Sequence, residues 1–201
     1  MSVSKALEKL AFVIRVLSVP SVMAWVAFTL LYFFSPGFFA DVLHYVAAVA
    51  FIAILPILAY PLQPVIPKFR DSGRKGQREL AIIFSLCGYL GGILFTLLVP
   101  CANGEKIVYL TYFVSGLLIA LSTLLLKFRA SGHACGIAGP ITVLAWYISP
   151  WFLFGYLLLP GVYWASRRLK RHTMGELLAG GVISVAAFFC SLFTIRLLAR
   201  V

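Results

Sequence analysis

Charged side chains are scarce in this sequence. Only 11% of its 201 residues are charged, whereas 62% are hydrophobic, and the mean hydropathy is +1.02. A water-soluble domain has about 25% charged residues, so the composition excludes an ordinary soluble protein. The sequence therefore predicts an integral membrane protein.

Acidic residues are the rarest of the charged types. The chain has 6 Asp and Glu residues against 17 Lys and Arg residues, which gives a net charge of +11. In a soluble protein this excess would suggest a nucleic-acid partner. Here the cations lie between apolar segments, where they orient the chain in the membrane or bind phosphate. We therefore expect no nucleic acid among the partners.

Cysteine is also rare, and its spacing argues against two kinds of site. Cys87, Cys101, Cys135 and Cys190 form no CxxC pair and lie mostly within or beside apolar segments. Such cysteines behave as small buried hydrophobic residues. The sequence thus indicates neither a disulfide framework nor a metal site, and we expect no cofactor.

The chain also lacks internal repeats and long linkers, which predicts a single membrane domain over residues 1–201. Its first apolar run, 11–34, is long enough to span a bilayer. A removable signal peptide has a shorter apolar core and a small-residue cleavage site. We therefore expect this run to be a retained helix.

Long apolar runs recur along the whole chain. A transmembrane helix needs about 17–25 apolar residues, because lipid cannot hydrogen-bond free backbone groups. The stretches that fit are roughly 11–34, 41–66, 79–100, 107–126, 132–148, 150–165 and 173–198. The predicted fold class is all-α, a polytopic transmembrane helical bundle with about seven spans. The count would be six if the short fifth and sixth stretches form one helix broken at Ser149-Pro150. Four prolines near the end of the second stretch are expected to kink or end that helix.

Lysines and arginines gather before the first span and in alternate loops, at 68–78, 127–133 and 165–172. The positive-inside rule places these loops in the cytoplasm, which suggests the plasma (inner) membrane. Because an even number of spans separates them, all three loops should meet at one face of the membrane. Histidines in the second and third loops could then approach each other.

The first of these loops is a candidate anion site. Lys68, Arg70, Arg74, Lys75 and Arg78 fall within eleven residues. Arginine offers forked donors that match phosphate oxygens, and lysine adds a compact charge. The same pattern also fits an ordinary cytoplasmic loop that touches anionic lipid headgroups.

The second loop contains Ser131-Gly132-His133 directly before an apolar run. Ser131 is a good N-cap residue, and free amides of a first helical turn attract anions. Gly132 permits close approach of the backbone, and His133 could donate a proton to a leaving oxygen. A capped helix with an interfacial histidine is the alternative.

In the third loop, His172 and Glu176 stand four residues apart at the start of the last span. This spacing puts them on one helix face, so that the carboxylate can accept from one ring nitrogen. The other nitrogen could then attack phosphorus, as an oriented nucleophile does. A positive-inside anchor with a glutamate at a helix start is the alternative. His44 has no polar neighbours in the sequence, and we assign it no role.

The three loops together resemble the type-2 phosphatidic acid phosphatase superfamily of membrane lipid phosphatases. Its motifs correspond here to "KFRDSGRKGQR", "ASGH" and "SRRLKRHTMGE". The resemblance implies that His172 is the nucleophile, His133 the general acid and Glu176 the orienting carboxylate. It also implies a phosphate cradle drawn from Lys68, Arg74, Lys75, Arg78, Ser131, Gly132, Arg167 and Arg168.

We therefore expect a membrane phosphatase that hydrolyses a lipid phosphate monoester, or a lipid or polyprenyl diphosphate, through a phosphohistidine. Its partner is the membrane lipid substrate, and no metal is expected because the cations supply the positive charge. The alternative is a carrier or binding protein for phospholipid or polyprenyl phosphate that has no turnover. A channel or transporter is a weaker fit, because the spans contain almost no ionisable residues.

Overall fold

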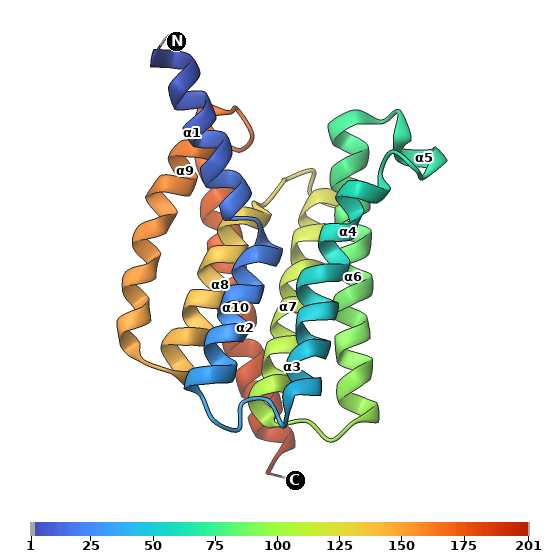
Figure 1. Ribbon diagram of the computed structural model, residues 1–201, viewed down its shortest axis with the longest axis vertical. Helices are drawn as coiled ribbons and strands as arrows, with labels where there is room; N and C mark the ends of the chain where they lie inside the picture. Colours follow the sequence, from blue (N-terminus) through green and yellow to red (C-terminus); the bar gives the residue numbers. More distant parts are fainter. Residues whose placement is uncertain (1–2, 201) are drawn as a thin grey trace.

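The computed structural model describes residues 3–200, and every regular element within them is helical (Figure 1). The predicted all-α class is therefore confirmed. In chain order the elements are α1 (Val3–Leu17), α2 (Pro20–Phe34), α3 (Val42–Ala48), η1 (Val49–Ile54), α4 (Leu55–Leu62), α5 (Pro67–Arg70), α6 (Gly73–Leu98), α7 (Asn103–Leu124), α8 (Gly132–Tyr147), η2 (Pro150–Leu157), α9 (Leu158–Arg168) and α10 (Met174–Leu198). Of these, η1 is a π-helix and η2 is a 3-10 helix.

Four continuous helical segments are long and apolar enough to cross a membrane, namely Val42–Leu62, α6, α7 and α10. The pair α1 and α2 adds a fifth if this pair, bent by 51°, counts as one span. The expected fifth and sixth spans are shorter: α8 has 16 residues, and the next segment is divided into η2 with 8 and α9 with 11. The helices support a membrane protein, but the count of seven spans is not confirmed.

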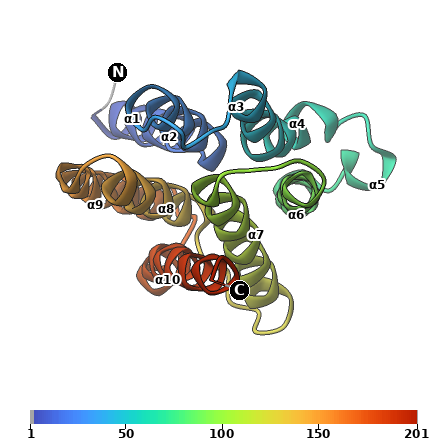
Figure 2. The same ribbon diagram turned by 90° about the horizontal axis from the view of Figure 1, so that it is seen from below.

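The two short segments do not join into one broken helix. The chain turns at Ser149, whose hydroxyl accepts a hydrogen bond from the amide of Trp151 at 3.4 Å. Beyond this turn η2 packs back against α8. Figure 2 shows α8 and α9 side by side, so the six-span alternative, which required one helix here, is not supported.

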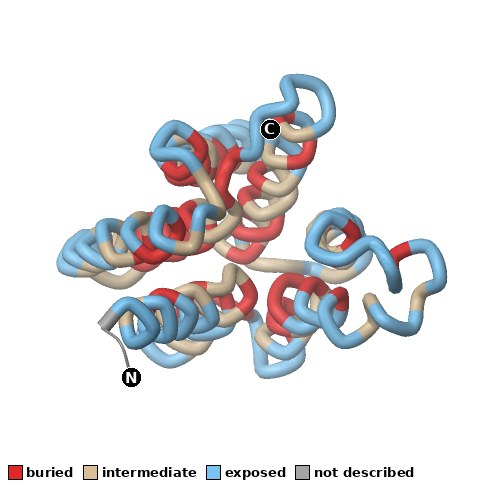
Figure 3. Tube along the Cα trace, turned by 90° about the horizontal axis from the view of Figure 1, so that it is seen from above, coloured by how far each residue is buried: buried red, intermediate tan, exposed pale blue. Residues whose placement is uncertain are grey.

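Apolar side chains cover the outside of the bundle as well as its core. Leu98 and Phe193 are 84% and 68% exposed, whereas Phe28 and Phe188 are buried in the main core cluster. Seen from above, the buried residues face the middle of the bundle and the exposed ones its periphery (Figure 3). Because lipid tails accept apolar surface that water would reject, this exterior fits a bilayer.

Prolines explain the irregular path of the second span. Pro56 has no N–H for the carbonyl one turn earlier, and directly before it the chain widens into the π-helix η1. α4 then ends at Leu62, before Pro64 and Pro67. The predicted interruption of this helix by its prolines is confirmed.

The three basic loops lie at one end of the bundle, which we call the cationic end (Figure 1). The start of α1, α5, the α7–α8 link and the α9–α10 link are all at this end, while the α6–α7 link and the C-terminal end of α10 are at the opposite one. The predicted gathering of these loops is therefore observed, whichever segments lie fully within the bilayer.

Candidate functional site

A cavity of about 640 Å³ lies at the cationic end, between α1, α2, α4, α6, α7, α8 and the α9–α10 link. His133 and His172 both line it, although they belong to different loops. The sequence predicted that these two histidines could meet. In the structure they share one space, which is the geometric condition for acting on one ligand.

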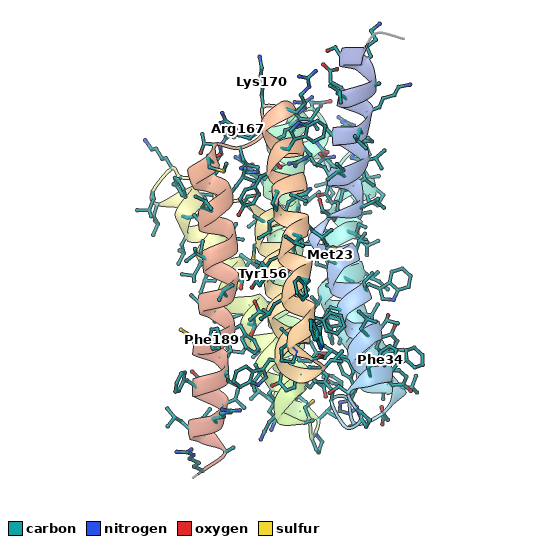
Figure 4. The ribbon with its side chains drawn as sticks, turned by 90° about the vertical axis from the view of Figure 1, so that its left-hand side faces the viewer. Met23, Phe34, Tyr156, Arg167, Lys170 and Phe189 are labelled. Atoms are coloured by element: carbon teal, nitrogen blue, oxygen red, sulfur yellow. The ribbon has the colours of Figure 1, made fainter. Side chains whose placement is uncertain are left out.

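The end of α9 directs His172 toward the cavity. Lys170 has a positive φ of 49°, the amide of Lys170 donates to the Arg167 carbonyl at 3.0 Å, and the amide of Arg171 donates to the Ser166 carbonyl at 2.9 Å. This pair of bonds is a Schellman motif, which ends a helix and turns the chain sharply. Figure 4 shows Arg167 and Lys170 at this turn. The turn brings Arg171 and His172 to the cavity wall.

Glu176 holds His172 by two routes. Its Oε2 accepts from the Thr173 amide at 2.9 Å, while the Thr173 hydroxyl accepts from the Glu176 amide at 3.2 Å. This reciprocal capping box fixes the first turn of α10. The same Oε2 lies 3.2 Å from Nδ1 of His172, so the ring donates from Nδ1 and leaves Nε2 with its lone pair. The Thr173-x-x-Glu176 spacing could have predicted the capping box from sequence.

The N-terminus of α8 is fixed against α10. Ser131 is the N-cap, as predicted, and its hydroxyl accepts from the Ala134 amide at 3.4 Å. Its own amide donates to the Glu176 carbonyl at 2.8 Å. The approach is so close that a Cβ on Gly180 would meet the Ser131 carbonyl oxygen. Through these contacts one small assembly positions both His133 and His172.

Cations surround the cavity on several sides. Its lining includes Arg15, Arg74, Lys75, Arg78, Arg129, Lys170 and Arg171. Arg74, Lys75 and Arg78 were predicted, and the structure places them here together with Gly132. Arg15 was missed because it lies inside an apolar run, and its Nη1 donates to the buried Ser166 hydroxyl, 151 residues away, at 2.8 Å. No local pattern marks such a distant contact.

Other predicted phosphate ligands are not part of the cavity wall. Lys68 lies on α5 with its Nζ 5.5 Å from the Phe69 ring centroid. Ser131 is fully buried at the α8 cap. Arg167 and Arg168 are exposed at the end of α9, where Arg168 donates to the Ser4 hydroxyl at 3.3 Å. The structure thus does not bring these four residues to the cavity lining.

Two of the cavity arginines have a buried, unused donor. Within the described part of the chain, Nε of Arg78 and Nε of Arg171 are buried and have no hydrogen-bond partner. Burial, followed by the positive charge of Arg74, lowers the pKa of Arg171. Buried donors without partners are costly, and an anion in the cavity would satisfy them.

The His172 ring has a pKa below its usual value. Burial is the main cause, and the positive charges of Arg15 and Arg129 also lower it, against the raising effect of the Glu176 carboxylate. At neutral pH the imidazole is therefore uncharged, which is the state needed for nucleophilic attack.

Away from the cations the cavity lining is mostly apolar and aromatic, with several hydroxyl groups among it. It continues between the middle parts of α6, α7 and α8, where Tyr89, Tyr112, Ile119 and Pro140 line it. The residues at its cationic mouth are suited to a charged headgroup, and those deeper in the bundle to an apolar chain. The arrangement can hold a molecule with both parts.

Comparison of this chain with protein-family models, with curated proteins and with solved structures found no match. The resemblance to the phosphatase superfamily therefore depends on the three sequence motifs alone.

His44, to which the sequence assigned no role, has polar neighbours in the structure. Nδ1 of His44 lies 2.9 Å from Oε2 of Glu105, and both side chains are buried. Cys101 is also adjacent, with its Sγ 3.7 Å from the same nitrogen. Sequence inspection missed this cluster because His44 and Glu105 are 61 residues apart.

Proposed function

We propose that this protein is a membrane lipid phosphatase that removes phosphate from a lipid phosphate monoester, or from a lipid or polyprenyl diphosphate. One observation carries the proposal: among residues 3–200, two histidines and seven cations line a single cavity, and two of its arginines have a buried donor without a partner. A bound phosphate would accept from these donors and balance the charge.

The chemistry follows from two imidazoles at one cavity, of which His172 is oriented by Glu176. Nε2 of His172 attacks phosphorus, so that a P–N bond forms while the P–O bond to the lipid breaks. His133 gives a proton to the departing lipid oxygen. Burial, followed by the positive charge of Arg15, lowers the pKa of His133 to about 3 when the cavity holds no anion. A bound phosphate dianion must therefore offset these cations and raise the pKa, so that the ring can donate a proton in the complex.

Water completes the cycle. His133, now neutral, accepts a proton from the water that attacks phosphorus, the P–N bond breaks, and inorganic phosphate leaves with His172 restored. The arginines stabilise the negative charge that develops on the phosphoryl oxygens, a task that metal ions perform in other phosphoryl-transfer sites.

A lipid is favoured over a soluble phosphate ester because the cavity continues into the apolar middle of the bundle. A tail lying along Tyr112 and Ile119 would leave the phosphate among the cations. We place the site at the cytoplasmic face of the plasma membrane on the basis of the positive-inside rule. A membrane-impermeant thiol reagent tests this placement: added outside cells, it should not label a cysteine introduced at Ser72.

The direct test uses purified protein in detergent, with a chelator present. Phosphatidate, phosphatidylglycerol phosphate and a polyprenyl diphosphate are offered separately, and inorganic phosphate is measured. We expect release from at least one, inhibition by vanadate, and a phosphoprotein that is labile to acid but stable to alkali. Release by the His172→Ala variant should be lost.

The rival is a lipid-phosphate carrier without turnover. Saturable binding of the same lipids with no release of phosphate, by protein whose thermal melting is cooperative, would support the carrier and overturn the phosphatase. Release that persists in His172→Ala would overturn the phosphohistidine.

A further inference from the structure

A second cluster of reactive side chains lies at the end of the bundle opposite the cavity. His44 comes from α3, Glu105 from the first turn of α7, and Cys101 from the link between α6 and α7 (Figure 1). Their potential ligand atoms all lie within 4.8 Å of one another. This cluster plays no part in the proposed phosphatase chemistry.

Burial makes the cluster unusual. The His44 and Glu105 side chains are only 6% and 1% exposed. A carboxylate removed from water is costly unless a positive charge and full hydrogen bonding compensate it. Something must therefore neutralise Glu105 at this depth.

The contacts converge on a single atom, Nδ1 of His44. Oε1 and Oε2 of Glu105 lie 3.1 and 2.9 Å from it, and Sγ of Cys101 lies 3.7 Å from it. A ring N–H has one proton and can point well at one acceptor only. A cation placed between the three groups would instead contact all of them.

The spacing fits tetrahedral coordination. Zinc binds nitrogen and oxygen at about 2.0–2.1 Å and thiolate at about 2.3 Å, which separates neighbouring ligand atoms by about 3.3–3.6 Å. The separations from Nδ1 of His44, 2.9 and 3.1 Å to the carboxylate oxygens and 3.7 Å to the sulfur, lie near these values, and all the ligand atoms lie within 4.8 Å of one another. Small side-chain rotations would complete the site.

We propose that His44, Cys101 and Glu105 bind one Zn²⁺ ion. The mixed nitrogen, sulfur and oxygen donor set matches this borderline-soft ion. With a neutral imidazole, a thiolate and a carboxylate, the bound site has no net charge, which suits an apolar interior. Cys101 is partly exposed, so a water molecule can take the fourth position.

Asp41 supports the site without being one of its ligands. Its Oδ1 accepts from the amides of Leu43 and His44 at 2.8 and 3.1 Å, which caps α3 and fixes the backbone of His44. The ion would then tie α3 to α7 and to the end of α6. We infer that the ion closes this end of the bundle.

The test is Zn²⁺ binding to the full chain in detergent, purified with a tag that contains no histidine or cysteine and stripped with a chelator. Titration against a chromophoric chelator should give one Zn²⁺ per chain. Co²⁺ should produce the charge-transfer absorbance of a cobalt–thiolate bond. Zn²⁺ should also raise the melting temperature, because it binds the folded state.

Cys101→Ser is the informative variant, and Cys190→Ser, at an exposed cysteine on α10, is its matched control. Cys101→Ser should weaken Zn²⁺ binding by more than about 100-fold, since loss of an outer partner alone costs 10–100-fold. It should also abolish the thiolate band, while Cys190→Ser keeps both. If the unmodified protein binds no Zn²⁺, or if both variants bind it equally, the proposal is overturned. His44 and Glu105 would then form only a buried ion pair. Neither result depends on phosphatase activity.

Discussion

The two ends of the bundle differ in how their buried charged groups are arranged. At the cationic end, seven cations surround an open cavity, and two buried arginine donors have no partner within the described chain. At the opposite end, His44, Cys101 and Glu105 contact one another closely. Unpaired charge beside open space indicates a site for a large anionic ligand. Charges that converge within 4.8 Å indicate a site for a single ion.

The largest effect should come from the nucleophile itself. His172→Asn keeps the size and polarity of the side chain but cannot form the phosphoenzyme, so phosphate release should fall by at least about 10³-fold. Zn²⁺ binding at the opposite end should persist, which would separate the two ends functionally. Phosphate assays and chelator competition on one preparation measure both. A fall of less than tenfold would contradict the assignment.

A second large effect should follow from Gly180→Ala. The new methyl group would clash with the Ser131 carbonyl oxygen, which is backbone and cannot rotate away. Such overpacking costs about 1–3 kcal/mol, and displacing α8 from α10 moves His133 relative to His172. A misplacement of about 1 Å can reduce activity by about 100-fold.

Gly175→Ala is the matched control on the same helix, because a Cβ there meets nothing within 4 Å. It should melt at the same or a slightly higher temperature and keep its activity. If Gly180→Ala melts and hydrolyses lipid phosphate as Gly175→Ala does, the contact between α8 and α10 does not position the site.

The pH dependence should reveal the charges around His172. Its pKa is lowered mainly by burial, so activity should fall on acidification only below the usual range of a histidine, where the ring becomes protonated. Glu176→Gln removes a contact that raises this pKa, so its acid limb should move to lower pH. Arg129→Gln removes a charge that lowers the pKa, so its limb should move to higher pH.

These opposite shifts can be measured as kcat/KM against pH for each variant, because kcat/KM reports the pKa values of the free enzyme. Glu176→Gln should also lower the plateau, because the tautomer of His172 is no longer held. Shifts of the same sign in both variants would contradict the electrostatic account.

Much of the fold is readable from local sequence, because hydropathy marks any segment that lipid can surround. The boundaries of the helices are harder to predict from local sequence. Residues 73–78 were expected in a loop, yet they form the first turns of α6, since charged side chains at the membrane surface do not interrupt a helix. The count of seven spans is not confirmed for the short segments, because hydropathy reports composition and not continuous helix length.

The candidate site divides in the same way. The Ser131 cap and the contact of His172 with Glu176 depend on residues three or four apart, which local spacing reveals. The contacts of Arg15 and His44 were not predicted from the sequence, because their partners are 151 and 61 residues away. Only the packing of distant helices brings those pairs together.

The smallest effects come from two arginines that make nearly equivalent contacts. Arg15 on α1 donates to Ser166 on α9, and Arg168 on α9 donates to Ser4 on α1. Arg15 lines the cavity, whereas Arg168 is exposed and outside it. Losing a hydrogen bond to a charged group costs about 1.5–3 kcal/mol, so Arg15→Gln should reduce kcat/KM by about 10- to 100-fold. Arg168→Gln should change it by less than about twofold, because exposed contacts contribute little.

Comparing the Arg15 and Arg168 variants shows whether activity depends on the cavity or on the link between α1 and α9. Thermal melting of both variants reports the structural contribution of each link, and kcat/KM reports the contribution to phosphate binding. If Arg15 acts only by tying the helices together, Arg15→Lys should have the same melting temperature and the same reduced kcat/KM as Arg15→Gln. If its charge meets phosphate, Arg15→Lys should recover part of kcat/KM even where the melting temperature does not recover, since an ammonium group still attracts the anion without the forked donors.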